Sequence, residues 1–283
     1  MSGDTQGNIF NHLRASRSLI QSLLAHKPAD EKWSSFRNEA LGFVIELYTY
    51  LKLTNSVTYC ANVNPLQPLD PWVMSLEEMV SFPTFGVLFA GCQDMYRLIP
   101  EIHKLAYLRL AEEGTGSDRA SAALRETHDD LHNRIASWEM PPAATRRENI
   151  EDRTHRRYAA ETLREGLYIY LATAIGGSMI TEEEIQAIQD HVRTLFSYAP
   201  ALAASQYSTA MLWPLMIAGA CVVRPEEQQL LLDGIRTGRH SMGHLTLLTN
   251  ILQRLYDDPD PRAYGLYGLY ITMRKHRLSI TIA

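Results

Sequence analysis

Five side chains that can ligate a metal ion fall within the six-residue segment HDDLHN, which runs from His128 to Asn133. Asp129, Asp130 and Asn133 have the spacing of an aspartate-rich motif that holds magnesium and a diphosphate, because Mg²⁺ prefers oxygen ligands. His128 and His132 lie four residues apart, so a helix would place both rings on one face, as in a pair of metal ligands. The segment therefore offers two kinds of metal chemistry.

The surroundings of this segment favour a different interpretation. The aspartate-rich motif is that of class I terpene synthases, and their second motif, an asparagine, a serine and a glutamate at fixed helical spacing, is not evident downstream. The neighbouring residues are mostly polar and charged, which is typical of a solvated helix face. We therefore predict no metal site here and keep Asp129 and Asp130 only as weak candidates for metal ligands.

Another histidine pair, His240 and His244 in HSMGH, has a glycine between its members and lacks the glutamate that a zinc protease places beside the first histidine. Hydroxyl and carboxyl groups inside apolar segments are further candidates for chemistry. Tyr168 and Tyr170 could donate a hydrogen bond to a carbonyl, although core packing is the simpler interpretation of both. Glu46 and Asp94 have hydrophobic sequence neighbours, where an unpaired carboxylate would be costly.

From these residues we select Tyr168, Tyr170, Asp94 and His240 as candidate catalytic residues. The sequence contains no glycine-rich phosphate loop and no dinucleotide fingerprint, and no Ser-His-Asp or Cys-His arrangement can be inferred from it. We therefore predict that the protein binds no cofactor.

Composition excludes several classes of protein. Of the 283 residues, 46% are hydrophobic and 21% are charged, and the net charge of -5 provides no basic region that would neutralise nucleic-acid phosphates. The three cysteines, Cys60, Cys92 and Cys221, are far apart, which argues for a reducing compartment. The first twenty residues lack the apolar core of a secretory signal. We expect an intracellular protein, in the cytoplasm or the nucleus, that binds no nucleic acid directly.

The longest apolar run is STAMLWPLMIAGACVV, from Ser208 to Val223. It ends at Arg224 and contains Pro214 near its centre, whereas a membrane span needs roughly 20 apolar residues. We therefore predict a buried helix and no membrane contact.

Apolar residues recur at helical spacing along most of the chain, and no segment shows convincing strand alternation. Pro100 should kink or divide one helix, and Gly176 and Gly177 should end another. Thr181, followed by three glutamates, is a good helix start. No repeat and no long linker divides the chain. We predict an all-α fold, a single bundle of roughly nine to eleven helices spanning residues 1–283.

The order of several segments resembles the fungal-specific transcription factor domain that follows binuclear zinc-cluster DNA-binding domains. Members of that family typically contain a histidine-leucine turn, a helix that ends in isoleucine-proline, an apolar tyrosine-containing helix and a tryptophan-proline-leucine run. The corresponding segments here, covering about Asn11 to about Tyr256, are NHLRASRSLI, FGVLFAGCQDMYRLIPEIHKLA, LREGLYIYLATAI, LWPLMIAGACVV and MGH.

The resemblance has one important gap. The family's zinc cluster uses six cysteines near the N-terminus, whereas this sequence has three isolated cysteines, and it starts at the histidine-leucine turn. We therefore expect either a fragment of a longer regulator or a stand-alone descendant, and in both cases no DNA binding by the family's mechanism.

The resemblance implies an all-helical regulatory domain that responds to metabolites and often forms dimers. We expect it to bind a hydrophobic small molecule or a protein partner, and we name Trp213, Met216, Tyr170 and Phe89 as the candidate ligand-binding wall. A cofactor-free natural-product enzyme, such as a cyclase or pericyclase for a polyketide or terpenoid, is the alternative. A magnesium-dependent terpene cyclase is the third hypothesis.

Overall fold

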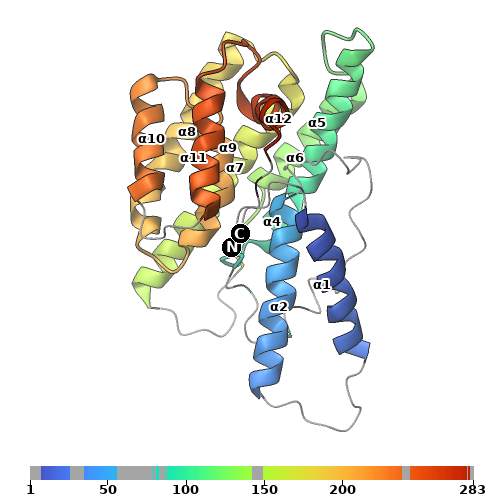
Figure 1. Ribbon diagram of the computed structural model, residues 1–283, viewed down its shortest axis with the longest axis vertical. Coiled ribbons are helices and arrows are strands. Elements are labelled where there is room, and N and C mark those ends of the chain that lie inside the picture. The colour runs from blue at the N-terminus through green and yellow to red at the C-terminus, as the bar shows by residue number, and fades with distance from the viewer. Residues whose placement is uncertain are drawn as a thin grey trace.

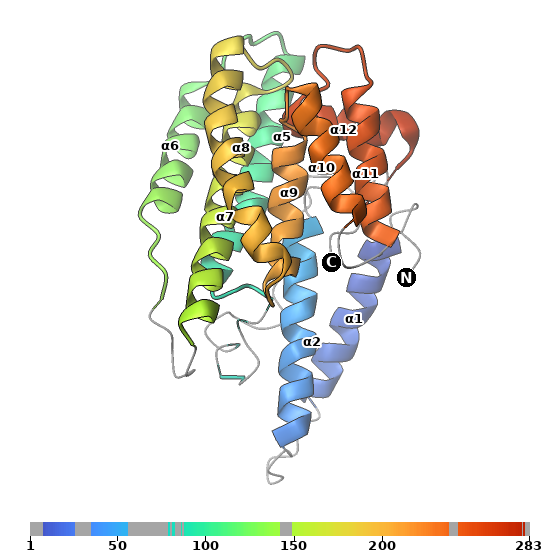
Figure 2. The same cartoon turned by 90° about the vertical axis from the view of Figure 1, so that its left-hand side faces the viewer.

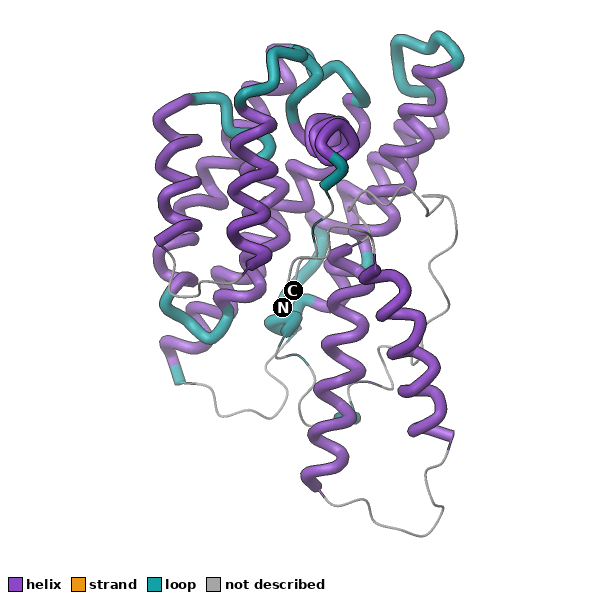
Figure 3. The backbone as a smooth tube through the Cα atoms, in the orientation of Figure 1, coloured by secondary structure: helices purple, strands orange, loops and turns teal. Residues whose placement is uncertain are grey.

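The structure is a computed structural model, and it describes residues 8–25, 35–55, 79, 81–82, 86, 88–141, 149–237, 243–278 and 280. Within these residues every regular element is a helix, which confirms the predicted all-α fold with nine to eleven helices (Figure 3). The elements in chain order are α1 (Asn8–Ala25), α2 (Ser35–Thr54), α4 (Gln93–Tyr96), α5 (Leu98–Gly114), α6 (Ala122–Ala136), α7 (Ile150–Gly176), α8 (Glu182–Ala203), the 3-10 helix η2 (Ser208–Met211), α9 (Leu212–Gly219), α10 (Pro225–Thr237), α11 (Gly243–Tyr256) and α12 (Gly265–His276).

The longest helix, α7, lies at the centre of the bundle and packs against α5, α6, α8, α9 and α12. Local signals define its ends. The Asn149 side chain accepts a hydrogen bond from the Asp152 backbone N–H at 2.7 Å, and the helix stops at Gly177, whose φ is +76°. Glycine tolerates this left-handed conformation because it has no Cβ. The predicted glycine stop is therefore confirmed.

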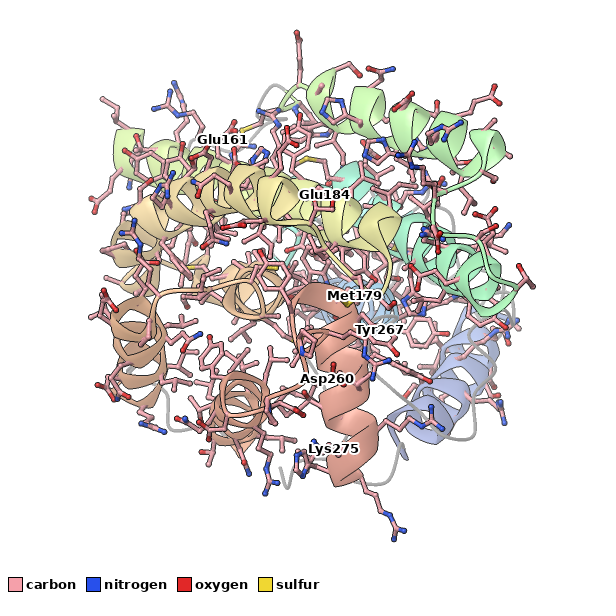
Figure 4. All side chains as sticks on the ribbon, turned by 90° about the horizontal axis from the view of Figure 1, so that it is seen from above. Glu161, Met179, Glu184, Asp260, Tyr267 and Lys275 are labelled. Atoms are coloured by element: carbon pink, nitrogen blue, oxygen red, sulfur yellow. The ribbon has the colours of Figure 1, made fainter. Side chains whose placement is uncertain are left out.

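Helix α8 returns antiparallel to α7 and begins with a capping box. The Thr181 hydroxyl accepts from the Glu184 backbone N–H, and the Glu184 carboxylate accepts from the Thr181 backbone N–H at 2.8 Å. Figure 4 labels Glu184 in this first turn of α8. Without these acceptors, both backbone N–H groups would be unsatisfied donors at the helix start. This explains why the motif marks the first residue of a helix in the sequence.

The apolar run from Ser208 to Val223 contains η2 and α9, and most of its residues lie in the core. Every residue from Trp213 to Gly219 is buried, as predicted, and Pro214 lies in the first turn of α9, where its missing N–H costs nothing. No helix among the described residues is long and apolar enough to cross a membrane.

The C-terminal end of α9 is held by four other helices. The backbone carbonyls of residues 219–222 each accept a hydrogen bond from a different element, so that groups left unpaired by a helix end are satisfied inside the core. The four donors, in order, are the Tyr256 hydroxyl of α11 (2.7 Å), the Gly265 N–H of α12 (2.9 Å), the Gln189 amide of α8 (2.7 Å) and the Gln228 amide of α10 (2.9 Å).

Helices α1 and α2 form a hairpin that projects from the rest of the bundle (Figures 1 and 2). The hairpin has a small hydrophobic cluster of its own, separate from the main core, made by Ile20, Leu41, Ile45, Tyr48 and Met79. At its inner end, Tyr50 reaches the main core and its hydroxyl donates to the Thr209 carbonyl at 3.3 Å.

One sequence expectation needs correction. Asp94 is exposed on α4, so its hydrophobic sequence neighbours did not indicate burial; Met95 and Tyr96 face the core instead. The expected division at Pro100 is confirmed: α4 ends at Tyr96 and α5 begins at Leu98, with Pro100 in its first turn, where it has no N–H to donate to the Tyr96 carbonyl. In the sequence, the three prolines of NPLQPLDPW, residues 64–72, also predict a loop, but this segment lies outside the described residues.

The turn between α7 and α8 is clamped to α5. The Glu113 carboxylate accepts the Ser178 backbone N–H at 3.1 Å and pairs with the buried Arg109 guanidinium at 3.2 Å. Arg109 also donates to the carbonyls of Ser117 and Asp118, which belong to the turn between α5 and α6. One charged pair therefore fixes two turns.

We predict that Gly177→Ala destabilises the protein by about 2–4 kcal/mol, because a Cβ there would collide with the Glu113 carboxylate and would sit at a left-handed φ. Urea unfolding followed by circular dichroism measures the change. Gly114→Ala is the control, since a Cβ at that helical position meets nothing within 4 Å. An equal effect of both substitutions would contradict the proposed clamp.

Candidate functional site

Helices α7 and α9 are packed closely together at Gly166. A Cβ at this position would lie 3.0 Å from the Pro214 Cβ and 3.4 Å from Cζ3 of the Trp213 ring. Side chains on a helix face repeat every three to four residues, so Thr162 and Tyr170, four positions before and after Gly166, lie on this same face. The small residue thus brings one strip of α7 against the start of α9.

Trp213 is fully buried at this contact, and its ring meets the Tyr170 ring edge to face with centroids 5.4 Å apart. The indole N–H finds no acceptor within the described part of the chain, and the buried Thr162 hydroxyl likewise has no hydrogen-bond partner there. A buried N–H without an acceptor costs about 1–3 kcal/mol, and the Trp213 donor is one of several buried polar atoms, the Thr272 hydroxyl among them, without a partner in the described residues.

The Tyr170 hydroxyl lies 3.2 Å from Nδ1 of His103, a partly buried residue of α5. Burial lowers the pKa of His103 to about 4, so its ring is neutral near pH 7. Burial also raises the pKa of Tyr170 well above its usual value of 10, so the phenol keeps its proton. A neutral imidazole beside a protonated phenol can share a hydrogen bond with it, and neither group places a charge in the core.

We define the polar centre as His103, Tyr170 and Trp213, which come from α5, α7 and α9. Chemically it offers one neutral imidazole, one phenol and one indole N–H in apolar surroundings. Such a set can hold an uncharged ligand through a carbonyl or hydroxyl group.

A second aromatic cluster lies where α2 and α4 meet the main core. Phe89 packs against Tyr50 and Tyr96, with ring centroids 5.8 and 5.2 Å away. The segment that carries Phe89 is fixed by the buried Glu46 carboxylate of α2, whose Oε1 accepts the backbone N–H groups of Gly86 (3.1 Å) and Leu88 (2.7 Å). Glu46 is therefore a buried carboxylate with backbone partners, as its apolar neighbours required.

Comparison with known families was made on the whole chain. The family model of the fungal specific transcription factor domain matches residues 1–255 of the 283. The chain belongs to this family. No curated protein and no solved structure matches it significantly. The helical bundle is therefore a regulatory-type domain of fungal transcription factors.

The transcription factor domain brings together only part of the predicted ligand-binding wall. Tyr170 and Trp213 are in contact, and Met216 follows one helical turn after Trp213 on α9, fully buried. Phe89 is also fully buried but belongs to the second aromatic cluster, so its assignment to the same wall stays a prediction.

The other candidates in this domain are dispersed. Tyr168 is partly buried on the outer side of α7, and its ring lies against those of His132 and His191. Asp129 and Asp130 are exposed on α6, and His240 lies outside the described residues. No group of three or more potential metal ligands lies together in the part of the domain that the structure describes.

Sequence reasoning missed His103 and Thr162. The sequence did indicate that His103 faces the core. In LIPEIHKLA it follows Ile102 and lies four residues after Ile99, and both isoleucines are buried, so helical periodicity places His103 on the same face as Ile99. Nothing in the sequence indicated that α7 and α9 pack closely together at Gly166, since that depends on the partner helix.

We predict that His103 makes the domain less stable in acid. Its pKa is lower in the folded protein than in the unfolded chain, near 6.5, so the unfolded state takes up the proton first and stability falls between pH 6.5 and 4. The loss between pH 7.5 and 5 should be about 2 kcal/mol. Urea unfolding at both pH values measures it, and His103→Gln should lack this part of the pH dependence.

Tyr170→Phe is the matched variant. It should cost about 1 kcal/mol at both pH values, because it removes one hydrogen bond. It should keep the pH dependence, because burial is the cause of the low pKa. Loss of the pH dependence in Tyr170→Phe would contradict this cause.

Proposed function

We propose that this domain is a metabolite-responsive regulatory module that binds an uncharged, largely apolar small molecule at the polar centre and does not contact DNA. The observation that carries the proposal is the Trp213 indole N–H, which is fully buried beside Tyr170 and has no acceptor among the described residues. A ligand with a carbonyl or hydroxyl oxygen would supply that acceptor and offset the cost of burial.

The surroundings of this donor support an apolar ligand. Tyr170 packs against the Trp213 ring, Met216 lies one helical turn further along α9, and both are fully buried. Burial keeps His103 neutral, so the centre presents no charge that would favour an ionic ligand. Apolar walls with a few oriented polar groups are typical of small-molecule sites.

The remaining features of the proposal follow from composition and family. The net charge of -5 and the three isolated cysteines leave neither a basic surface excess nor a zinc cluster for DNA binding. We propose that residues 1–283 form one domain, that it acts inside the cell, in the cytoplasm or nucleus, without contacting a membrane, and that it works through a protein partner or a second copy.

A cofactor-free enzyme of specialised metabolism is the second candidate. The contact between His103 and Tyr170 favours it, because a phenol backed by a neutral imidazole can polarise a carbonyl and return a proton. The same polar centre would then hold a reactive conformer of a polyketide or terpenoid instead of sensing a finished metabolite.

The ligand proposal predicts saturable binding of an uncharged aromatic ketone. The probe is 2-acetyl-6-(dimethylamino)naphthalene, whose emission shifts to the blue when its carbonyl leaves water. Trp213→Phe keeps an aromatic ring but removes the donor, so it should weaken binding about tenfold, the equivalent of one hydrogen bond. Trp138→Phe, a change at a partly buried tryptophan beside Arg164, is the control and should bind as the parent does. Equal affinity of all three proteins would refute the site.

The enzyme alternative predicts turnover. A strain that lacks the gene should accumulate an intermediate, and the purified protein should convert this intermediate without added cofactor. Tyr170→Phe should lower the rate at least tenfold, whereas the affinity should change less, because the phenol acts in the transition state. Binding of the intermediate without conversion would favour the regulatory function.

A further inference from the structure

The sequence alone predicted no metal site in the segment from His128 to Asn133, but from the geometry of the structure we propose that His128 and His132 on α6 form a surface site for a divalent transition-metal ion, with Asp129 as the positioning residue. This site is independent of the polar centre. It also differs from the aspartate-rich magnesium motif, because its ligands are imidazole nitrogens and its metal class is Cu²⁺ and Zn²⁺.

Helix α6 provides a rigid support for the pair. The Ser121 hydroxyl accepts the Leu124 backbone N–H at 3.3 Å and caps the helix start. Leu124, Leu131 and Ile135 are buried against the bundle, which fixes the rotation of the helix. With that rotation His132 is exposed and His128 partly exposed, both on the solvent-accessible side.

The two rings already lie next to each other. Their centroids are 6.3 Å apart and their planes differ by only 28°. An ion that both rings bind must lie about 2.0–2.1 Å from each nitrogen, which requires the centroids to move slightly closer. A rotation of the His128 side chain, which is 27% exposed, supplies this movement without disturbing the core.

Asp129 determines which nitrogen of His128 faces an ion. Its Oδ1 lies 3.0 Å from Nδ1 of His128. In the tautomer that carries its proton on Nδ1, the Nδ1–H donates a hydrogen bond to the carboxylate, so the lone pair of Nε2 is left for a metal. A carboxylate in this position is the usual second partner of a metal-bound histidine, and it also adds a negative charge beside the cation.

His132 is oriented by packing. Its ring lies against Tyr168 of α7 at 5.2 Å, and Tyr168 also lies against His191 of α8 at 5.1 Å. Nδ1 of His191 already has a partner, the Glu165 carboxylate at 2.6 Å. We therefore assign two protein ligands to the site, with water completing the coordination.

The charges around the pair permit a cation. Arg134 pairs with Glu101 at 2.7 Å and with Asp130 at 3.3 Å, and Arg125 donates to the Ala120 carbonyl at 2.9 Å. Both guanidinium groups are directed to their own acceptors. Asp130 is engaged by Arg134, whereas Asp129 contacts the histidine, so the two neighbouring aspartates have different roles.

Two imidazole ligands select the metal. Imidazole nitrogen suits copper, nickel and zinc, and the affinity for a given site rises from nickel to copper and falls again for zinc. Mg²⁺ prefers an octahedral set of oxygen ligands, which this pair lacks. We therefore expect Cu²⁺ to bind most tightly, Zn²⁺ less tightly and Mg²⁺ not at all.

The test titrates the full chain with Cu²⁺ and with Zn²⁺ in a weakly coordinating buffer, by calorimetry and, for Cu²⁺, by electron paramagnetic resonance. One equivalent should bind with hyperfine structure from two imidazole nitrogens. His128→Gln and His132→Gln should each weaken this binding at least tenfold, and the double variant should lose the step entirely. His128 and His132 both lie on the surface, so the two single variants and the double variant should fold. Unaltered helicity in circular dichroism verifies this.

Asp129→Asn and Asp130→Asn form the matched pair. Asp129→Asn should weaken Cu²⁺ binding about tenfold, as is typical of a lost second partner, and Asp130→Asn should stay within about twofold of the parent. Equal loss in both variants, competition by Mg²⁺, or a stoichiometric Cu²⁺ step that survives in the double histidine variant would each overturn the proposal.

Discussion

The end of α9 is the constraint on which the other helices depend. A helix that stops inside a hydrophobic core leaves carbonyl groups that water cannot reach, and each must find a donor. Here the carbonyl of Gly219, the last residue of α9, and the carbonyls of residues 220–222 in the turn after it accept from donors on α11, α12, α8 and α10. The Gly219 carbonyl also accepts the Val222 N–H at 3.3 Å. A shift of α8, α10 or α12 would remove the donor of one of the other three carbonyls, so these contacts favour one arrangement of the helices.

The same helix carries Trp213 at its other end. Gly166 lets α7 approach it so closely that the tryptophan and Tyr170 form one packed unit with His103. A change at the indole is therefore only a few helical turns from the carbonyl contacts that organise the C-terminal half of the bundle. Protein interiors are packed as densely as organic crystals. A displacement at one end of so short a helix is therefore transmitted to its other end, and we expect α9 to move as a unit.

Much of the fold could be predicted because its signals are local. The capping box at Thr181, the glycine stop at Gly177 and the apolar run of α9 each depend on a few consecutive residues. The polar centre could be predicted only in part, since Tyr170 and Trp213 are far apart in sequence and their contact depends on Gly166. Asp94 shows the limit, because hydrophobic neighbours do not reveal which side of a short helix faces the core.

The hairpin of α1 and α2 has a hydrophobic cluster of its own, built from few side chains. Its connection to the main body depends on Glu46, which holds the segment from Gly86 to Phe89, and on Tyr50, which reaches η2. A small cluster of this kind has a lower opening free energy than the main core. We therefore expect the outer part of the hairpin to open at a lower free energy than the bundle around α7 and α9, whereas the inner end of α2, with Tyr50 and Leu53 in the main core, opens with the bundle.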